Sequence, residues 1–469
     1  MILADLDPSA TIGVRSIALY ASVVIGALFT LAWRSEIGIY ILTVLLPLQT
    51  TRYHQHAFPL GSKIVDILLL CVLIGTVIRP PQSKLAYRPR IAMFLVCLAI
   101  FYFLSLWRGA FYLGGDLPIW FSDHRLVDYK NFIVMPLLAF AVVRAIRTRR
   151  QIVTIVILCG ITSIAVDYSY LKSSFGRDFT HYSEDTRDAG PLGYAGENGL
   201  ASYLVEATAF VLPLIVVRRN PRLRLFALTV AGANTVCLLF SYSREAYLAL
   251  AVILCFLAVV KVRALFIPIL LLAIGWQAIL PVAVRERIAM TYTRSDPGME
   301  AALDASAQER VMLWSDAMEL FRQNPVFGTG FLTYAELSRV GSYKDTHNFY
   351  LKMLVETGLV GLCLFILQLL LLLREGMRLF TRARDSLLSL IGLGYGAMIV
   401  AATIVNLFGD RWMFIQVDSN LWILLGCVIC GSSLAAESRK QLQHPQTTTI
   451  AKAPWAISAD SLAHEKVMS

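Results

Sequence analysis

Long stretches of the chain carry no charged side chain. The four clearest of them are residues 225–243, 264–284, 386–409 and 419–436. An α-helix rises about 1.5 Å per residue, so about 20 apolar residues cross the roughly 30 Å hydrocarbon core of a bilayer. Each stretch therefore predicts a transmembrane helix. The same interpretation applies to apolar residues 17–33, 38–48, 64–78, 91–107, 132–143, 152–166, 200–217, 246–260 and 351–373.

Together these stretches predict an all-α polytopic membrane protein with about 12–13 transmembrane helices. Helices are expected because every backbone polar group inside a bilayer must be hydrogen-bonded within the protein. The composition agrees, because 57% of the residues are hydrophobic and only 16% are charged. We expect a single transmembrane domain over residues 1–436. The remaining residues, 437–469, are rich in Gln, Thr, Ser and Ala and predict a disordered cytoplasmic tail.

The chain has 42 basic and 32 acidic residues, so its net charge is +10. Many of the basic residues gather in alternate loops, at residues 79–90, 144–150, 218–224, 261–263, 374–384 and 439–440. The positive-inside rule assigns these loops to the cytoplasm. The charge therefore indicates orientation, and we expect no nucleic-acid partner. The longer loops then face outside, at about residues 51–63, 108–131, 168–199, 285–346 and 409–418.

Arg244 and Glu245 lie between two apolar stretches. A charge that faces lipid is costly, so charged residues beside membrane spans carry information. One interpretation is a tight hairpin whose arginine reaches the lipid headgroups. The other is a fixed guanidinium that binds an anionic ligand.

The largest outer loop, residues 285–346, contains a segment that predicts an amphipathic helix at 305–324. Its apolar side chains recur at helical spacing, at Val311, Trp314, Met318 and Phe321. Arg310 lies in the first turns of this helix. An arginine in such a place is usually solvated, so this segment alone leaves a surface role and a binding role open.

His347 stands where the large outer loop enters an apolar stretch. A histidine at a water-facing helix start can accept a proton near neutral pH, although a structural histidine is the alternative. We expect Asp345 or Thr346 to cap the helix that follows. Glu356 lies nine residues after His347, where a carboxylate needs a partner or a cavity.

These motifs, taken in order, resemble the O-antigen ligase and polymerase superfamily of bacterial inner membranes. The resemblance covers about residues 190–365. The matching positions are Asn198 with Ala201, Ser243-Arg244, Arg310 with Trp314, Pro325 with Gly328 and Gly330, His347-Asn348, and Glu356 with Gly358 and Gly361.

The resemblance implies a glycosyltransferase of the bacterial inner membrane with its active site on the periplasmic side. Its partners would be the lipid bilayer, an undecaprenyl-diphosphate-linked glycan donor and a glycan acceptor. The acceptor is lipid A–core in a ligase and another lipid-linked glycan in a polymerase of exopolysaccharide or O-antigen repeat units. We favour the ligase and keep the polymerase as the alternative. A protein O-oligosaccharyltransferase and a non-enzymatic polysaccharide transporter are more distant alternatives.

The resemblance also implies roles for individual residues. Arg244 and Arg310 would hold the diphosphate, and His347 would take the proton of the acceptor hydroxyl in an inverting displacement. Arg285 and Arg287 are candidate helpers. The other residues expected around the site are Tyr242, Asn348, Glu356, Asn198 and Trp314. No metal or other cofactor is expected, because the outer loops contain no carboxylate cluster such as Asp-x-Asp. If this assignment holds, Arg244, Arg310 and His347 should converge in space.

Overall fold

The computed structural model describes residues 14–48, 57–81, 85–87, 89–194, 196–218, 220–290, 292–293, 302–303, 305–340 and 345–443. In this part of the chain, ten helices are long and apolar enough to cross a membrane, or up to eleven if a bent pair counts as one span. This confirms an all-α polytopic membrane protein. The number of spans is lower than the 12–13 that the apolar stretches predict.

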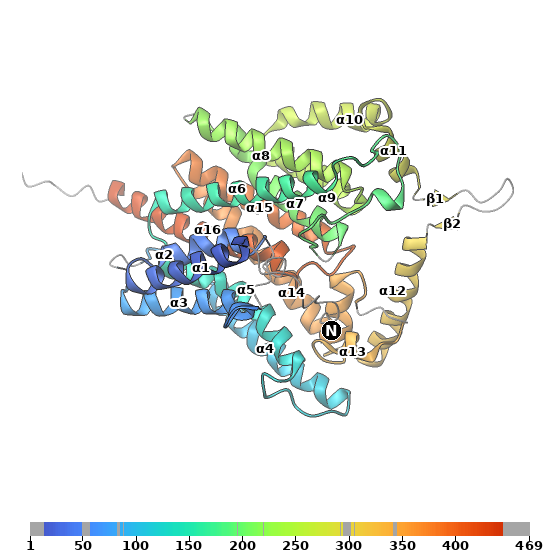
Figure 1. Cartoon of the computed structure of the whole chain (residues 1–469), viewed down its shortest axis with the longest axis horizontal. Coiled ribbons are helices and arrows are strands. Elements are labelled where there is room, and N and C mark those ends of the chain that lie inside the picture. The colour runs from blue at the N-terminus through green and yellow to red at the C-terminus, as the bar shows by residue number, and fades with distance from the viewer. Residues whose placement is uncertain are drawn as a thin grey trace, which may run out of the picture.

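Helices make up almost all of the regular structure (Figure 1). In chain order they are α1 (Val14–Ala32), α2 (Glu36–Leu45), η3 (Gly61–Lys63), α3 (Ile64–Ile78), α4 (Ile91–Tyr112), α5 (His124–Ala145), α6 (Arg149–Ser173), η4 (Glu184–Thr186), α7 (Glu197–Val211), η5 (Leu212–Val216), α8 (Pro221–Phe240), α9 (Arg244–Val260), η6 (Arg263–Leu265), α10 (Phe266–Ile279), α11 (Val282–Ala289), α12 (Ala305–Gln323), α13 (Thr333–Leu337), α14 (Phe349–Arg382), α15 (Ser386–Val405) and α16 (Ile415–Gln443). The strands β1 (Tyr292–Thr293) and β2 (Ala302–Leu303) pair antiparallel before α12.

Two apolar stretches account for part of the lower span count. Helix α2 has only ten residues, and at about 1.5 Å per residue it is about 15 Å long, half of a bilayer core. The stretch 264–284 breaks at Pro281, where α10 and α11 meet at an angle of 101°. Proline has no backbone N–H, so it removes a helix hydrogen bond and favours a kink or a break. Charge-free length alone therefore overestimates the number of crossings.

The centre of the molecule is formed by α14, α15 and α16, which pack against α5, α7 and α9 (Figure 1). Large aromatic side chains fill this core. The rings of Trp412 and Trp422 lie 5.8 Å apart, and the ring of Phe365 lies 5.3 Å from that of Trp412. The core thus joins the start of α16 to the first half of α14.

The chain returns to the start of α14 after α15. The backbone N–H of Phe349 donates to the carbonyl of Asn406 at 2.9 Å, so the link between α15 and α16 lies beside the first turn of α14. We call this end of the helix bundle the site end, and the end at Arg382 the opposite end. Helix α16 continues through Gln443, so the first residues of the predicted tail are helical. The tail residues after 443 lie outside the described part.

Candidate functional site

The start of α14 is capped by Asn348. Its side-chain Oδ1 accepts a hydrogen bond from the N–H of Leu351 at 3.1 Å. The prediction that Asp345 or Thr346 caps this helix is therefore wrong. The Thr346 hydroxyl instead donates to the carbonyl of Asn348 at 2.7 Å. The cap lies one residue after His347, so His347 belongs to the turn before the helix.

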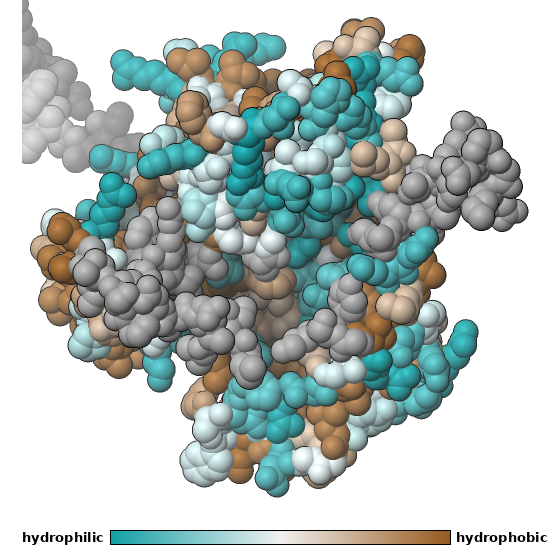
Figure 2. All heavy atoms as spheres, turned by 45° about the vertical axis from the view of Figure 1, so that its right-hand side comes forward, coloured by the Kyte–Doolittle hydropathy of each residue, from teal (hydrophilic) through white to brown (hydrophobic). Residues whose placement is uncertain are grey.

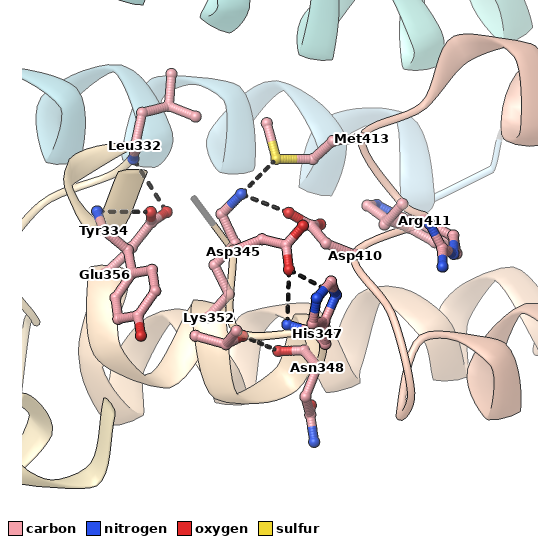
Figure 3. Close-up of polar contacts among 12 residues, drawn as sticks. Leu332, Tyr334, Asp345, His347, Asn348, Lys352, Glu356, Asp410, Arg411 and Met413 are labelled. Atoms are coloured by element: carbon pink, nitrogen blue, oxygen red, sulfur yellow. Dashed lines mark hydrogen bonds and ion pairs between the residues drawn. The ribbon is translucent and has the colours of Figure 1, made fainter. Parts of the chain in front are cut away.

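His347 and Asp345 form a hydrogen-bonded pair (Figure 3). The Nδ1 atom of His347 lies 2.8 Å from Oδ1 of Asp345, and the backbone N–H of His347 donates to the same oxygen at 2.8 Å. Burial alone would raise the pKa of Asp345, but the hydrogen bonds and charge of His347 lower it to about 2. The carboxylate is therefore ionised at neutral pH. It fixes the orientation of the imidazole, which stands on a left-handed residue with φ of 49°.

Helix α12 is tied to this turn by Trp314. Its indole N–H donates to the carbonyl of Thr346 at 3.0 Å. Arg310 precedes Trp314 by four residues, and residues four apart lie on the same face of a helix. The Arg-x-x-x-Trp spacing thus places the arginine on the face of α12 that turns toward His347.

The Ser-Arg motif at 243–244 is held by Asn198 from the start of α7. The Ser243 hydroxyl donates to Oδ1 of Asn198 at 2.9 Å. The Arg187 guanidinium donates to the same oxygen at 3.2 Å. Tyr242, which is fully buried, turns the chain between α8 and α9 with φ of 53°. Asn198 and Tyr242 therefore fix where α9 begins, and with it the position of Arg244.

Arg287 reaches the same motif from α11. Its Nε donates to the carbonyl of Tyr242 at 3.3 Å, and its Nη1 lies 3.3 Å from Oε1 of Glu184. Burial lowers the pKa of Arg287, and the charges of Arg187 and Arg244 act in the same direction. These contacts show that Arg287 lies near Arg244. Arg285, the other predicted helper, is engaged elsewhere, because its guanidinium donates to the carbonyl of Gln277 in α10.

The buried carboxylate of Glu245 lies beside Arg411. Nη2 of Arg411 lies 3.9 Å from Oε1 of Glu245, and both side chains are buried. The charges of Arg310 and His347 also act on this carboxylate. Glu245 follows Arg244 directly at the start of α9, and the convergence of the Arg244, Arg310 and His347 side chains stays a prediction.

Arg411 is a residue of this cluster that the sequence reasoning missed. It lies in the link between α15 and α16, and its backbone N–H donates to Oδ1 of Asn406 at 3.0 Å. Beside it, Oδ2 of Asp410 lies 2.5 Å from Nζ of Lys352, and both side chains are buried (Figure 3). The sequence contained a signal for this link, because Lys352 lies inside the apolar stretch 351–373 and needs an acidic partner such as Asp410.

Glu356 has a structural role and lies on the far side of Lys352 from His347 (Figure 3). Its carboxylate accepts the backbone N–H groups of Leu332 at 3.0 Å and Tyr334 at 3.1 Å, at the start of α13. Gly358 breaks α14 just after it, with φ of 69° and ψ of −170°. A Cβ atom there would lie 2.2 Å from the carbonyl oxygen of Val326. The Glu-Thr-Gly motif therefore locks the turn after α12 against α14.

Seen from the side of α12, this end of the molecule has a recess with hydrophobic side chains at its floor and hydrophilic side chains around it (Figure 2). Among the described residues, no group of three or more His, Cys, Asp or Glu side chains could hold a metal ion. The arrangement offers arginines for an anion and a histidine with an orienting carboxylate for a proton.

Comparison with known proteins addresses the identity of this region. The sequence model of the family described as O-Antigen ligase matches residues 225–366. This segment contains Arg244, Arg310, His347 and Glu356. No curated protein matches the chain. The chain is thus a multi-pass membrane protein in which residues 225–366 are similar to the O-antigen ligase family.

Proposed function

We propose that the protein is a ligase-type glycosyltransferase that moves a glycan from an undecaprenyl-diphosphate donor to a sugar hydroxyl on the periplasmic face of the bacterial inner membrane. The observation that carries this proposal is the gathering of Arg310, Arg411 and His347 around Glu245, next to Arg244. An anion site beside a proton acceptor is what the transfer of a sugar from a lipid diphosphate requires.

The arginines serve the leaving group. As the bond between the sugar and the diphosphate breaks, negative charge builds on the phosphate oxygens. Guanidinium groups match these oxygens with two parallel hydrogen bonds, and such bonds strengthen where water is excluded. Arg244 and Arg310 have this role, and Arg411 adds a guanidinium beside the carboxylate of Glu245.

His347 serves the acceptor. Its imidazole takes the proton of the acceptor hydroxyl while that oxygen attacks the anomeric carbon and the lipid diphosphate leaves with the electron pair. Asp345 holds the ring through Nδ1 at 2.8 Å and stabilises the imidazolium that forms. One base and one displacement invert the anomeric centre. Five further residues position the segments that carry the reacting side chains, and they are Trp314, Asn348, Asn198, Tyr242 and Glu356.

Deletion of the gene followed by glycan analysis tests the proposal. A ligase predicts that lipid A–core loses its polymer and that lipid-linked polymer accumulates. The wild-type gene should restore the pattern, and a His347→Ala variant should not. If single repeat units accumulate on the lipid carrier instead, the protein is a polymerase with the same donor chemistry. Unchanged surface and lipid-linked glycans would contradict both.

A further inference from the structure

A second polar cleft lies at the opposite end of the bundle. It has a volume of about 590 Å³. It lies between the link from α1 to α2, the end of α3 and the link from α5 to α6. Arg149, the first residue of α6, pairs with Asp385 just after α14 at 2.6 Å, which places this region at the end away from His347. The cleft is therefore separate from the proposed transfer site.

The lining of this cleft is strongly basic. Its arginines come from helix ends and the links that follow them, and are Arg34, Arg79, Arg144 and Arg147. Glu36 is the one acidic residue among the lining residues. Four guanidinium groups around one carboxylate leave an excess of positive charge, and a nearby anion would reduce their repulsion.

Two of these arginines have structural partners. Nη1 of Arg79 donates to the carbonyl of Ala32 at 2.6 Å, at the last turn of α1. Nη1 of Arg147 donates to the carbonyl of Ile146 at 2.7 Å, just after α5. The last carbonyls of a helix have no partner within the helix, and basic side chains commonly bind them. Arg79 and Arg147 are thus explained in part by the fold.

The other two arginines are not explained in this way. Arg144 makes no hydrogen bond or ion pair within the described part of the chain. Arg34 pairs with Glu36 at 3.4 Å, and its side chain is 60% exposed. Both face a cleft that is large enough for a phosphate group with its ester substituents.

Apolar side chains continue from the rim of the cleft along the outer surface of the bundle. Val77 and Ile78, at the end of α3, are 70% and 62% exposed. Trp33, at the end of α1, lines the cleft and is 63% exposed. Tryptophan is typical of the level where headgroups meet acyl chains. The cleft thus has basic side chains where a span ends and an apolar surface directly below them.

We propose that this cleft binds the phosphate headgroup of an anionic membrane lipid, whose acyl chains lie along α1 and α3. Clusters of basic residues between the ends of membrane helices suit such headgroups, because each arginine adds electrostatic attraction. Arg34 and Arg144 contact the phosphate, and Arg79 and Arg147 hold the helix ends that shape the cleft. The proposal does not depend on the transfer chemistry at the site end.

The test uses the purified full-length protein in detergent, titrated with phosphatidylglycerol and with zwitterionic phosphatidylcholine, with bound lipids counted by native mass spectrometry. We expect a preference of about tenfold or more for phosphatidylglycerol. The double variant Arg34→Ala/Arg144→Ala should weaken phosphatidylglycerol binding by about tenfold or more, because each arginine near a headgroup adds about a fivefold factor. The matched control, Arg222→Ala/Arg224→Ala, removes two exposed arginines that do not line the cleft and should change binding less than about twofold.

Three results would overturn the proposal. Equal binding of the two lipids would remove the role of lipid charge. Equal weakening in both double variants would show attraction to the general basic surface. Displacement of phosphatidylglycerol by millimolar inorganic phosphate would assign the cleft to free phosphate. If the cleft double variant unfolds, the comparison of the two lipids on the wild-type protein still tests the role of lipid charge. Arg144→Lys keeps the positive charge and should therefore keep the preference for phosphatidylglycerol.

Discussion

Arginines at the two ends of the helix bundle meet carboxylates in different surroundings, because the pair of Arg149 with Asp385 at the opposite end is partly exposed and that of Arg411 with Glu245 at the site end is buried. At the opposite end, the guanidinium groups of Arg79 and Arg439 donate to helix-end carbonyls, those of Ala32 and Arg382. At the site end, Arg411 faces the buried carboxylate of Glu245. A carbonyl is neutral, so its arginine keeps an uncompensated charge that favours one side of the membrane. A buried carboxylate instead balances a group of arginines and keeps them together where an anionic substrate can bind.

The largest expected effect comes from the loss of the proposed base. His347→Ala should lower glycan transfer by about 10²–10⁴-fold, which is the usual contribution of a positioned base. Transfer is measured with purified protein and a lipid-linked glycan donor. His124→Ala is the matched control, because His124 is an exposed histidine paired with Glu336 at the same end. Full activity of the His347 variant would remove the base from the mechanism.

The next effect separates guanidinium geometry from charge. Arg244→Lys and Arg310→Lys should each lower transfer by about 10- to 100-fold, because lysine keeps the charge but loses the two parallel hydrogen bonds. Arg322→Lys, on an exposed part of α12, should be neutral. If the Arg244 variant reached wild-type rates, Arg244 would be a residue that only reaches the lipid headgroups.

The third effect concerns the scaffold of the site end. Gly358→Ala should destabilise the protein by about 2 kcal/mol or more, because a Cβ atom at this positive φ is strained and meets the Val326 carbonyl. The change is measured as a lower midpoint of thermal unfolding. Gly232→Ala is the control, since a Cβ atom there meets nothing within 4 Å. An unchanged midpoint for the Gly358 variant would show that the interlocked turn adds little stability.

The smallest effect is expected at the opposite end. Arg439→Ala should change the transfer rate by less than about twofold, because exposed pairs contribute little and the residue lies far from His347 along α14 and α16. The same transfer assay measures it. A large loss of activity would show that the two ends are coupled, and the contrast between them would then fail.

Much of the fold could be predicted from the sequence, because a charge-free stretch has few alternatives to a membrane helix. The described helices that are long enough for a span number ten to eleven against 12–13 apolar stretches, and part of the difference arises where length and proline decide, at α2 and at Pro281. The site motifs predict a convergence of Arg244, Arg310 and His347, and this stays a prediction. Arg411 was missed as a site residue because its contact with Glu245 is tertiary. Asp345 was missed although its pair with His347 is local, because the sequence suggested a capping role for it.

The length of α14 has a consequence for where the site lies relative to the bilayer. Its 34 residues correspond to about 51 Å at 1.5 Å per residue, whereas the hydrocarbon core is only about 30 Å thick. About two fifths of the helix length therefore exceeds the thickness of the hydrocarbon. The break at Gly358 sets apart the first nine residues of the helix, 349–357, next to His347. If the protein transfers glycans as proposed, the turns before this break would raise His347 to the depth at which a lipid carrier presents its phosphates, so that the sugar would react in water while its lipid tail stays in the membrane.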